Sequence, residues 1–326
     1  MSDVRWGILG AAKFAREFMG PALTLAPGGH VAALATSDAA KADPFRVFAP
    51  ALRVHDSFDA LLADPEIDAV YIPLPNGLHV EWSLKAMKAG KHVLCEKPMA
   101  MQSGEYDQLV AARDAAGVLA AEAFMIVHHP QWQRARELLA DGAVGRLWRI
   151  DGAFSFDNRD AGNIRNRADM GGGGLRDIGV YVMGGARFAT GLEATDVHAR
   201  ILWENGVDVY AAITAKFGDA DYVSFTSIRM HPRQEMTFHG DKGVLRLPVP
   251  FNARVFGEAR LELHRGTETI TERWPAVNHY ELQVAAFNRS VCDGGVYPCP
   301  LEFSRGTQAM MDEAFASSSP AGNASE

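Results

Sequence analysis

The chain has 326 residues, of which 48% are hydrophobic and 22% are charged, and this composition excludes an intrinsically disordered protein. Its 32 basic and 40 acidic residues give a formal net charge of −8, which disfavours binding to a nucleic-acid backbone. Three scattered cysteines predict neither a disulfide framework nor a metal site, and the first residues lack the basic segment of a secretory signal. We therefore expect a cytoplasmic protein that needs no membrane and no metal.

The first part of the chain alternates predicted strands with predicted helices. Short apolar runs that end at glycine or at a polar turn predict strands at residues 4–9, 30–35, 52–55, 69–73, 92–95 and 118–122. Segments of helical pattern lie between them, at residues 11–25, 58–63, 79–89 and 103–116. This alternation predicts a parallel, doubly wound sheet of the Rossmann type.

The pattern changes after about residue 122. A predicted helix at residues 130–140 is followed by strand-like runs at 147–156, 194–203, 207–217, 222–230, 235–239, 243–247 and 261–265. Two more helices are predicted at residues 280–293 and 303–316. Because strands here follow one another directly, we expect a mainly antiparallel sheet. The fold class is therefore α/β, with a Rossmann domain over residues 1–122 and a second domain over residues 123–326.

Gly10 follows the first predicted strand, in a turn of the form G-x-A-x-x-A. In a dinucleotide-binding fold, Gly10 would permit the tight turn, Ala12 would let the diphosphate approach, and Ala15 would let the helix pack on the strand. Backbone N–H groups at the start of the helix would then bind the diphosphate. A simple strand-to-helix turn also accepts small residues, but its place at the first turn of the alternating half favours cofactor binding.

Thr36 and Ser37 follow the second predicted strand, at the point where this fold recognises the adenosine ribose. Their hydroxyls, with Lys41 close behind, suit the 2′-phosphate of NADP. Asp38 lies in the same stretch and would instead suit the ribose hydroxyl of NAD. We predict NADP as the cofactor and keep NAD as the alternative.

A lysine and a tyrosine are the candidate groups for proton transfer. Lys97 directly follows the fifth predicted strand, and ligands of doubly wound folds bind at the carboxyl ends of strands. A helix that starts near Gly174 would place Asp177 and Tyr181 four residues apart on one face. Because a nearby ammonium favours the phenolate form of tyrosine, Lys97 would make Tyr181 a usable base. The alternative is a helix that buries Tyr181 and is capped by Asp177.

These motifs together resemble the Gfo/Idh/MocA oxidoreductase family over nearly the whole chain. The resemblance is carried by the glycine turn at residues 7–15, by N-G-L-H at 76–79, by G-K-H-V-L-C-E-K-P at 90–98, and by the glycine run before Asp177 and Tyr181. With tyrosine at position 181, the motif resembles the branch of the family that contains glucose–fructose oxidoreductase, dimeric dihydrodiol dehydrogenase and NADP-dependent D-xylose dehydrogenase. The resemblance implies that the second domain has a large, open sheet that binds substrate and joins subunits into a homo-oligomer, a dimer or a tetramer.

The resemblance also implies roles for single residues. Lys97, Asp177 and Tyr181 fall on the catalytic positions of the family, and Arg165 falls on an arginine near cofactor and substrate. Trp274 and His279 are added as substrate candidates because aromatic faces pack against sugars, although packing in the core is the alternative for both. The cofactor-binding candidates are Gly10, Ala11, Ala12, Lys13, Phe14, Ala15, Thr36, Ser37, Lys41, Pro73, Leu74, Asn76, His79, Glu96, Lys97 and Arg165; the substrate-binding candidates are Lys97, Arg165, Asp177, Tyr181, Trp274 and His279.

We therefore expect an enzyme that transfers a hydride between NADP and a carbon of a small sugar or polyol. Our first hypothesis is an aldose 1-dehydrogenase that forms a lactone. A dihydrodiol or anhydrosugar dehydrogenase, or a carbonyl reductase, is the alternative on the same site. A non-catalytic NAD(P)-binding regulator is the second alternative, which an intact set of Lys97, Asp177 and Tyr181 disfavours.

Overall fold

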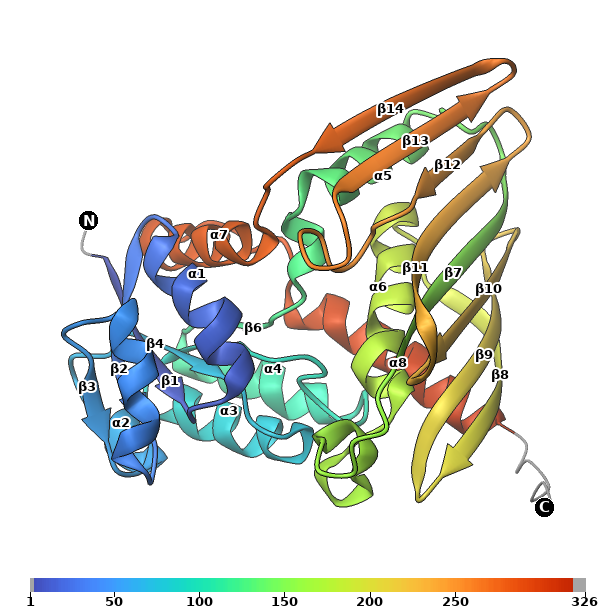
Figure 1. Ribbon diagram of the computed structural model, residues 1–326. Helices are drawn as coiled ribbons and strands as arrows, with labels where there is room; N and C mark the ends of the chain where they lie inside the picture. Colours follow the sequence, from blue (N-terminus) through green and yellow to red (C-terminus); the bar gives the residue numbers. More distant parts are fainter. Residues whose placement is uncertain (1–2, 319–326) are drawn as a thin grey trace. The chain divides into compact units, whose positions relative to one another are not determined.

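The computed structural model describes residues 3–318, which form two compact units (Figure 1). The first unit contains the described chain up to His128 together with His279–Arg305. The second unit contains His129–Asn278 together with the chain from Gly306 onward. The chain thus passes from the first unit to the second a few residues after the predicted border at 122, but the return of a C-terminal segment to the first unit was not predicted.

A six-stranded parallel sheet forms the centre of the first unit. The strand order is β3-β2-β1-β4-β5-β6, so the direction in which strands are added reverses between β1 and β4. Doubly wound folds bind ligands at such a switch point. The predicted Rossmann sheet is confirmed. Its strands are β1 (Val4–Leu9), β2 (Gly29–Ala35), β3 (Arg53–His55), β4 (Ala69–Ile72), β5 (His92–Cys95) and β6 (Ala120–Glu122).

Helices cover this sheet, which is why its central strands are apolar on both faces. The first predicted helix has a composite form: a π-helical turn, Ala15–Met19, continues into the short helix α1 (Gly20–Leu25). A 3-10 segment, Ala39–Val47, follows β2 and was not predicted. The remaining helices of this part of the chain are α2 (Phe58–Leu62), α3 (His79–Lys88) and α4 (Glu105–Ala116).

Helix α7 (His279–Asp293) belongs to the first unit although it lies near the far end of the sequence. Trp6 of β1 donates its Nε1–H to Asn288 Oδ1 at 3.0 Å, and its ring centroid lies 5.1 Å from that of Phe287. Asn288 also donates to the Pro27 carbonyl at 3.0 Å. Because the side chains of Trp6, Phe287 and Asn288 are buried, α7 is part of the hydrophobic core beside β1.

An eight-stranded sheet dominates the second unit, in the order β14-β13-β12-β11-β7-β10-β9-β8. It is mainly antiparallel, as predicted, although β7 and β10 run parallel. Strand β14 was not predicted because most of its side chains are exposed and polar, as suits an edge strand. The strands are β7 (Leu147–Asp157), β8 (Ala194–Glu204), β9 (Val207–Phe217), β10 (Ala220–Ser227), β11 (Arg229–Gly240), β12 (Val244–Leu247), β13 (Ala259–Arg265) and β14 (Glu268–Trp274).

Helices α5 (Pro130–Ala140) and α6 (Val180–Thr190) pack on one face of this sheet (Figure 1). On this face of the sheet, the ring centroid of Phe154 of β7 lies 5.7 Å from that of Tyr181 of α6 and 5.0 Å from that of Phe251. A π-helical turn, Leu175–Gly179, precedes α6. Helix α8 (Leu301–Ser317) closes the described chain, beginning in the first unit and ending in the second. Among residues 3–318, no helix is both long and apolar enough to cross a membrane.

Candidate functional site

The turn between β1 and the first helical segment has the features that a dinucleotide diphosphate needs. Gly10 adopts φ +100°, a conformation that disfavours other residues, and a Cβ there would approach Leu74 Cδ2 to 3.2 Å. Its N–H donates to the Ala35 carbonyl at 3.0 Å, which fixes the turn against β2. The helix then starts at Lys13, so the N–H groups around Ala11 and Ala12 lie at a helix N-terminus. The residues present therefore fit a bound diphosphate.

The side chains after β2 are arranged so that a hydroxyl and a lysine remain exposed. Asp38 Oδ1 accepts the Ala40 N–H at 3.1 Å and caps the 3-10 segment. Thr36 Oγ1 is held against the backbone of Asp38, at 3.3 Å from its nitrogen and 3.2 Å from its oxygen. Ser37 and Lys41 are exposed. One oxygen of Asp38 is thus engaged by its own backbone turn, and the contact of Ser37 and Lys41 with a 2′-phosphate stays a prediction.

Lys97 lies in a turn that two glutamates hold in place, the half-buried Glu96 and the buried Glu122. Tyr71 donates its hydroxyl to Glu96 at 2.7 Å, and burial raises the pKa of Glu96 while the Lys97 ammonium opposes that rise. After the turn, Glu122 at the end of β6 accepts the Met99 N–H at 2.8 Å. Burial raises the pKa of Glu122 also. The backbone on either side of Lys97 is therefore anchored to the ends of neighbouring strands.

His79, a candidate cofactor contact, is completely buried at the start of α3. Its Nδ1 lies 2.8 Å from the Pro98 carbonyl and its Nε2 lies 2.7 Å from the Leu74 carbonyl. Burial lowers the pKa of His79, although both carbonyls act to raise it. With both ring nitrogens facing backbone carbonyls, we infer that His79 joins the loop after β4 to the turn that carries Lys97. Pro73, Leu74 and the turn Asn76–Leu78 form that loop.

In the second unit, the structure pairs two of the predicted residues. Arg165 donates its Nε–H to Asp177 Oδ2 at 2.5 Å, and its Nη2 donates to Asp177 Oδ1 at 3.4 Å. The Asp177 carboxylate raises the pKa of Arg165. Tyr181 follows in α6 with 6% of its surface exposed, packed against Phe154 and Phe251. The helix starts at Gly174, as expected, but its first turn, Leu175–Gly179, is π-helical and not regular α-helix.

The remaining predicted residues lie at the following places. Phe14 is half-buried, with its ring centroid 5.3 Å from Phe18 and 5.6 Å from Tyr280. Lys13 is exposed, with its Nζ 4.0 Å from Glu17. Trp274 ends β14 in the second unit, whereas His279 starts α7 in the first unit and is 3% exposed. The burial of His279 agrees with the alternative of core packing.

Two residues that form hydrogen bonds to the turn of Lys97 were not predicted, namely Tyr71 and Glu122. Each lies within a strand, where an apolar run predicts burial but no function. Glu122 carried a usable signal, because a glutamate at the end of a buried strand needs partners for its charge. Tyr106 and the Met99 backbone are those partners, and the Tyr106 hydroxyl donates to Glu122 at 2.9 Å.

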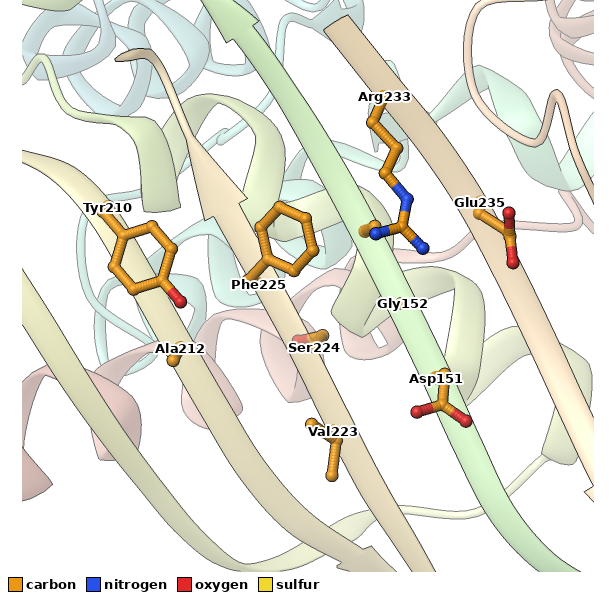
Figure 2. Close-up of a pocket in the computed structure, with 10 residues that line it drawn as sticks. Asp151, Gly152, Tyr210, Ala212, Val223, Ser224, Phe225, Arg233 and Glu235 are labelled. Atoms are coloured by element: carbon orange, nitrogen blue, oxygen red, sulfur yellow. The ribbon is translucent and has the colours of Figure 1, made fainter. Parts of the chain in front are cut away.

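A pocket in the second unit lies on the other face of the sheet from Tyr181. Figure 2 shows Arg233 and Glu235 of β11, Asp151 of β7 and Tyr210 of β9 around it. Ala153 lines this pocket, and because neighbouring strand residues point to opposite faces, Phe154 points to α6 instead. This pocket is therefore separate from Tyr181. The assembly of subunits through this sheet stays a prediction.

Family models match most of the chain. Residues 4–124 match the model described as "Oxidoreductase family, NAD-binding Rossmann fold", and residues 132–246 match the "GFO/IDH/MocA C-terminal domain". A dTDP-3,4-didehydro-2,6-dideoxy-alpha-D-glucose 3-reductase from Actinomadura kijaniata is 31% identical over 90% of this chain and 89% of its own. A D-xylose 1-dehydrogenase (NADP(+)) from Haloferax volcanii is 34% identical over 89% of both chains.

A similar solved structure is a 3-ketoreductase from Actinomadura kijaniata in complex with NADP and TDP-benzene. It is 28% identical, covers 97% of this chain and 98% of its own, and has a TM-score of 0.89. Solved structures of that enzyme include a variant with one lysine changed to alanine and another with one tyrosine changed to phenylalanine. With both family models and whole-chain relatives in agreement, this chain belongs to the Gfo/Idh/MocA oxidoreductase family.

Proposed function

We propose that the protein is an NADP-dependent sugar oxidoreductase that acts on a C–OH group, and that aldose oxidation to a lactone is its reaction. The observation that carries this proposal is the pairing of Arg165 with Asp177 in the turn that leads into the helix of Tyr181. A charged pair placed before a phenol suits the binding of a polar substrate beside a proton acceptor.

In this proposal Tyr181 accepts the proton of the sugar hydroxyl, and Lys97 orients that hydroxyl and favours the phenolate. Arg165 and Asp177 hold the neighbouring hydroxyl groups. NADP, held by the turn at Gly10 and by Ser37 and Lys41, supplies the two-electron oxidant. The substituted lysine and tyrosine of the 3-ketoreductase are as far apart in its sequence as Lys97 and Tyr181 are here, which supports their assignment.

Reduction of a keto group on a nucleotide-linked deoxysugar is the second candidate. It is favoured by the whole-chain similarity to dTDP-sugar 3-reductases, which share about a third of their residues with this chain. The reaction is the reverse of the first one at the level of the carbon, because Tyr181 would then give its proton to the carbonyl oxygen. The two candidates differ in the substrate and not in the groups that act on it.

A panel of substrates separates these functions through the fluorescence of NADPH. We expect oxidation of at least one pentose or hexose in the presence of NADP, with a lactone as the product. Turnover only with a dTDP-linked keto sugar and NADPH would support the second candidate, and turnover only with dihydrodiols or anhydro sugars would support the other redox alternative. Tight binding of NADPH without turnover of any member would contradict an enzymatic role and leave the regulator.

The choice of cofactor should depend on Lys41. We expect NADP to be preferred over NAD, and Lys41→Ala to lower kcat/KM for NADP about 10- to 150-fold, because a charge-assisted contact with a phosphate contributes roughly 1.5–3 kcal/mol. The value for NAD should stay within about twofold. Lys88→Ala at the end of α3 is the matched control, since it removes another exposed ammonium from the same unit. An equal loss with both cofactors would contradict a role for Lys41 at the 2′-phosphate.

A further inference from the structure

Asp208 is a buried carboxylate to which the proposed reaction gives no role. It lies at the start of β9 with 1% of its surface exposed. Its Oδ2 accepts the Leu175 N–H at 2.5 Å, and the Gly174 N–H also donates to Asp208. Leu175 opens the π-helical turn that continues into α6. The first N–H groups of a helix have no partner within the helix, so Asp208 caps this helix from a neighbouring strand.

The glycine run before the helix makes room for this contact. Gly173 adopts φ +119°, and a Cβ there would lie 2.1 Å from Asp208 Oδ1. On the other side, a Cβ at Gly172 would lie 2.7 Å from the Arg165 carbonyl, and the Gly173 N–H donates to that carbonyl at 2.9 Å. Replacing either glycine would push apart the start of the helix and one of its two neighbours. The run therefore lets Asp208 and the loop of Arg165 meet at one point.

Burial and the neighbouring donors have opposite effects on the charge of Asp208. Burial raises the pKa of Asp208 to about 7, against the Leu175 N–H and the Arg176 guanidinium, which lower it. Arg176 itself interacts with Asp208 and with Asp312 of α8. Burying this carboxylate costs free energy, which the N–H groups and the dipole of the helix N-terminus offset in part. Its removal would leave those N–H groups buried without their acceptor.

We propose that Asp208 is a positioning residue for the reaction, which fixes the start of the helix and thereby the places of Asp177 and Tyr181. This inference rests on the proposed function, because it takes Tyr181 as the group that exchanges the proton. Asp177 lies two residues after Leu175, within the turn that Asp208 caps, and Tyr181 follows on the same helix. A shift of about 1 Å in a reacting group can cost roughly 10²-fold in rate, so a small movement of this turn is sufficient.

The effect on the reaction is measured by a double-mutant cycle with Asp208→Ala and Tyr181→Phe. We expect Asp208→Ala to lower kcat about 10- to 100-fold with little change in the Kd of NADPH. In the Tyr181→Phe background the same substitution should have almost no further effect, because the residue it positions is already inactive. A purely structural role would lower kcat by the same factor in both backgrounds, and that result would overturn the proposal. If Asp208→Ala does not fold, Asp208→Asn takes its place in the cycle.

The effect on the helix is measured independently by amide hydrogen exchange. We expect Asp208→Ala to accelerate exchange in the peptide that spans residues 173–183. The control is Ser227→Ala, which removes another buried side chain of the sheet, one that donates to the Val209 carbonyl at 2.9 Å. It should leave exchange in that peptide and kcat unchanged. Unchanged exchange in Asp208→Ala would overturn the proposal, whereas absence of turnover in the unmodified protein would instead show that the proposed function is wrong.

Discussion

Replacing Tyr181 with phenylalanine should lower kcat by about 10²- to 10⁴-fold, the range that a positioned acid or base contributes. The ring would keep its packing against Phe154 and Phe251, so the fold and the Kd of NADPH should change little. Steady-state kinetics with the best substrate of the panel measures kcat, and fluorescence titration measures the Kd. The loss comes from the missing hydroxyl, which in our proposal carries the transferred proton.

Lys97→Met is the companion to this substitution and should cause a loss of similar size. The losses should not multiply in the double variant, because the two residues act on one proton transfer. Tyr210→Phe is the matched control, since it removes a phenol hydroxyl from the pocket on the other face of the sheet and should keep kcat within about twofold. If Lys97→Met and Tyr181→Phe both keep nearly normal turnover with an intact fold, the proposed mechanism is wrong.

Trp132→Ala should lower the free energy of unfolding by about 3–5 kcal/mol, the typical cost of removing a large buried aromatic side chain. Trp132 of α5 has no exposed surface, and its Nε1–H donates to the Pro250 carbonyl at 2.6 Å. Its ring centroid lies 6.2 Å from that of Phe251, which in turn packs against Tyr181. The substitution thus removes support from under α6. Urea denaturation followed by circular dichroism gives the change in free energy.

Trp148→Ala provides the comparison for this measurement. Trp148 is 51% exposed on β7, where the Arg146 guanidinium lies 4.5 Å from its ring centroid. Its removal should change the free energy of unfolding by less than about 1 kcal/mol. Similar losses for the two tryptophans would contradict the view that the packing between α5 and α6 stabilises the second unit.

The two sheets could be predicted because their strands are apolar runs separated by clear turn residues. Strand β9 was predicted with its observed bounds, and the turn at Gly218 joins it to β10. Strand β14 was missed because an edge strand with exposed polar side chains resembles a loop in composition. The return of α7 was missed for a different reason. The hydrogen bond between Trp6 and Asn288 joins residues that are far apart in sequence, and neither segment has a pattern that indicates its partner.

The candidate site was predictable where a motif lies on one continuous segment. The turn at Gly10 and the position of Lys97 after β5 follow from the order of strands and from glycine placement. The ion pair between Arg165 and Asp177 was not predicted, because it depends on how a loop folds back on the helix that follows it. Asp208 was missed for the same reason, since its partner at Leu175 lies on a separate element.

The order in which the chain is synthesised gives α7 a further consequence. Trp6 and Asn288 are 282 residues apart, and at a translation rate of roughly 5–20 residues per second the partner of Trp6 is made about 15–55 s later. By then the ribosome has already made every strand of the eight-stranded sheet. The core of the nascent Rossmann unit therefore stays incomplete until α7 has been made. A gene fragment that stops after His128 would encode a unit in which Trp6 cannot pack against α7.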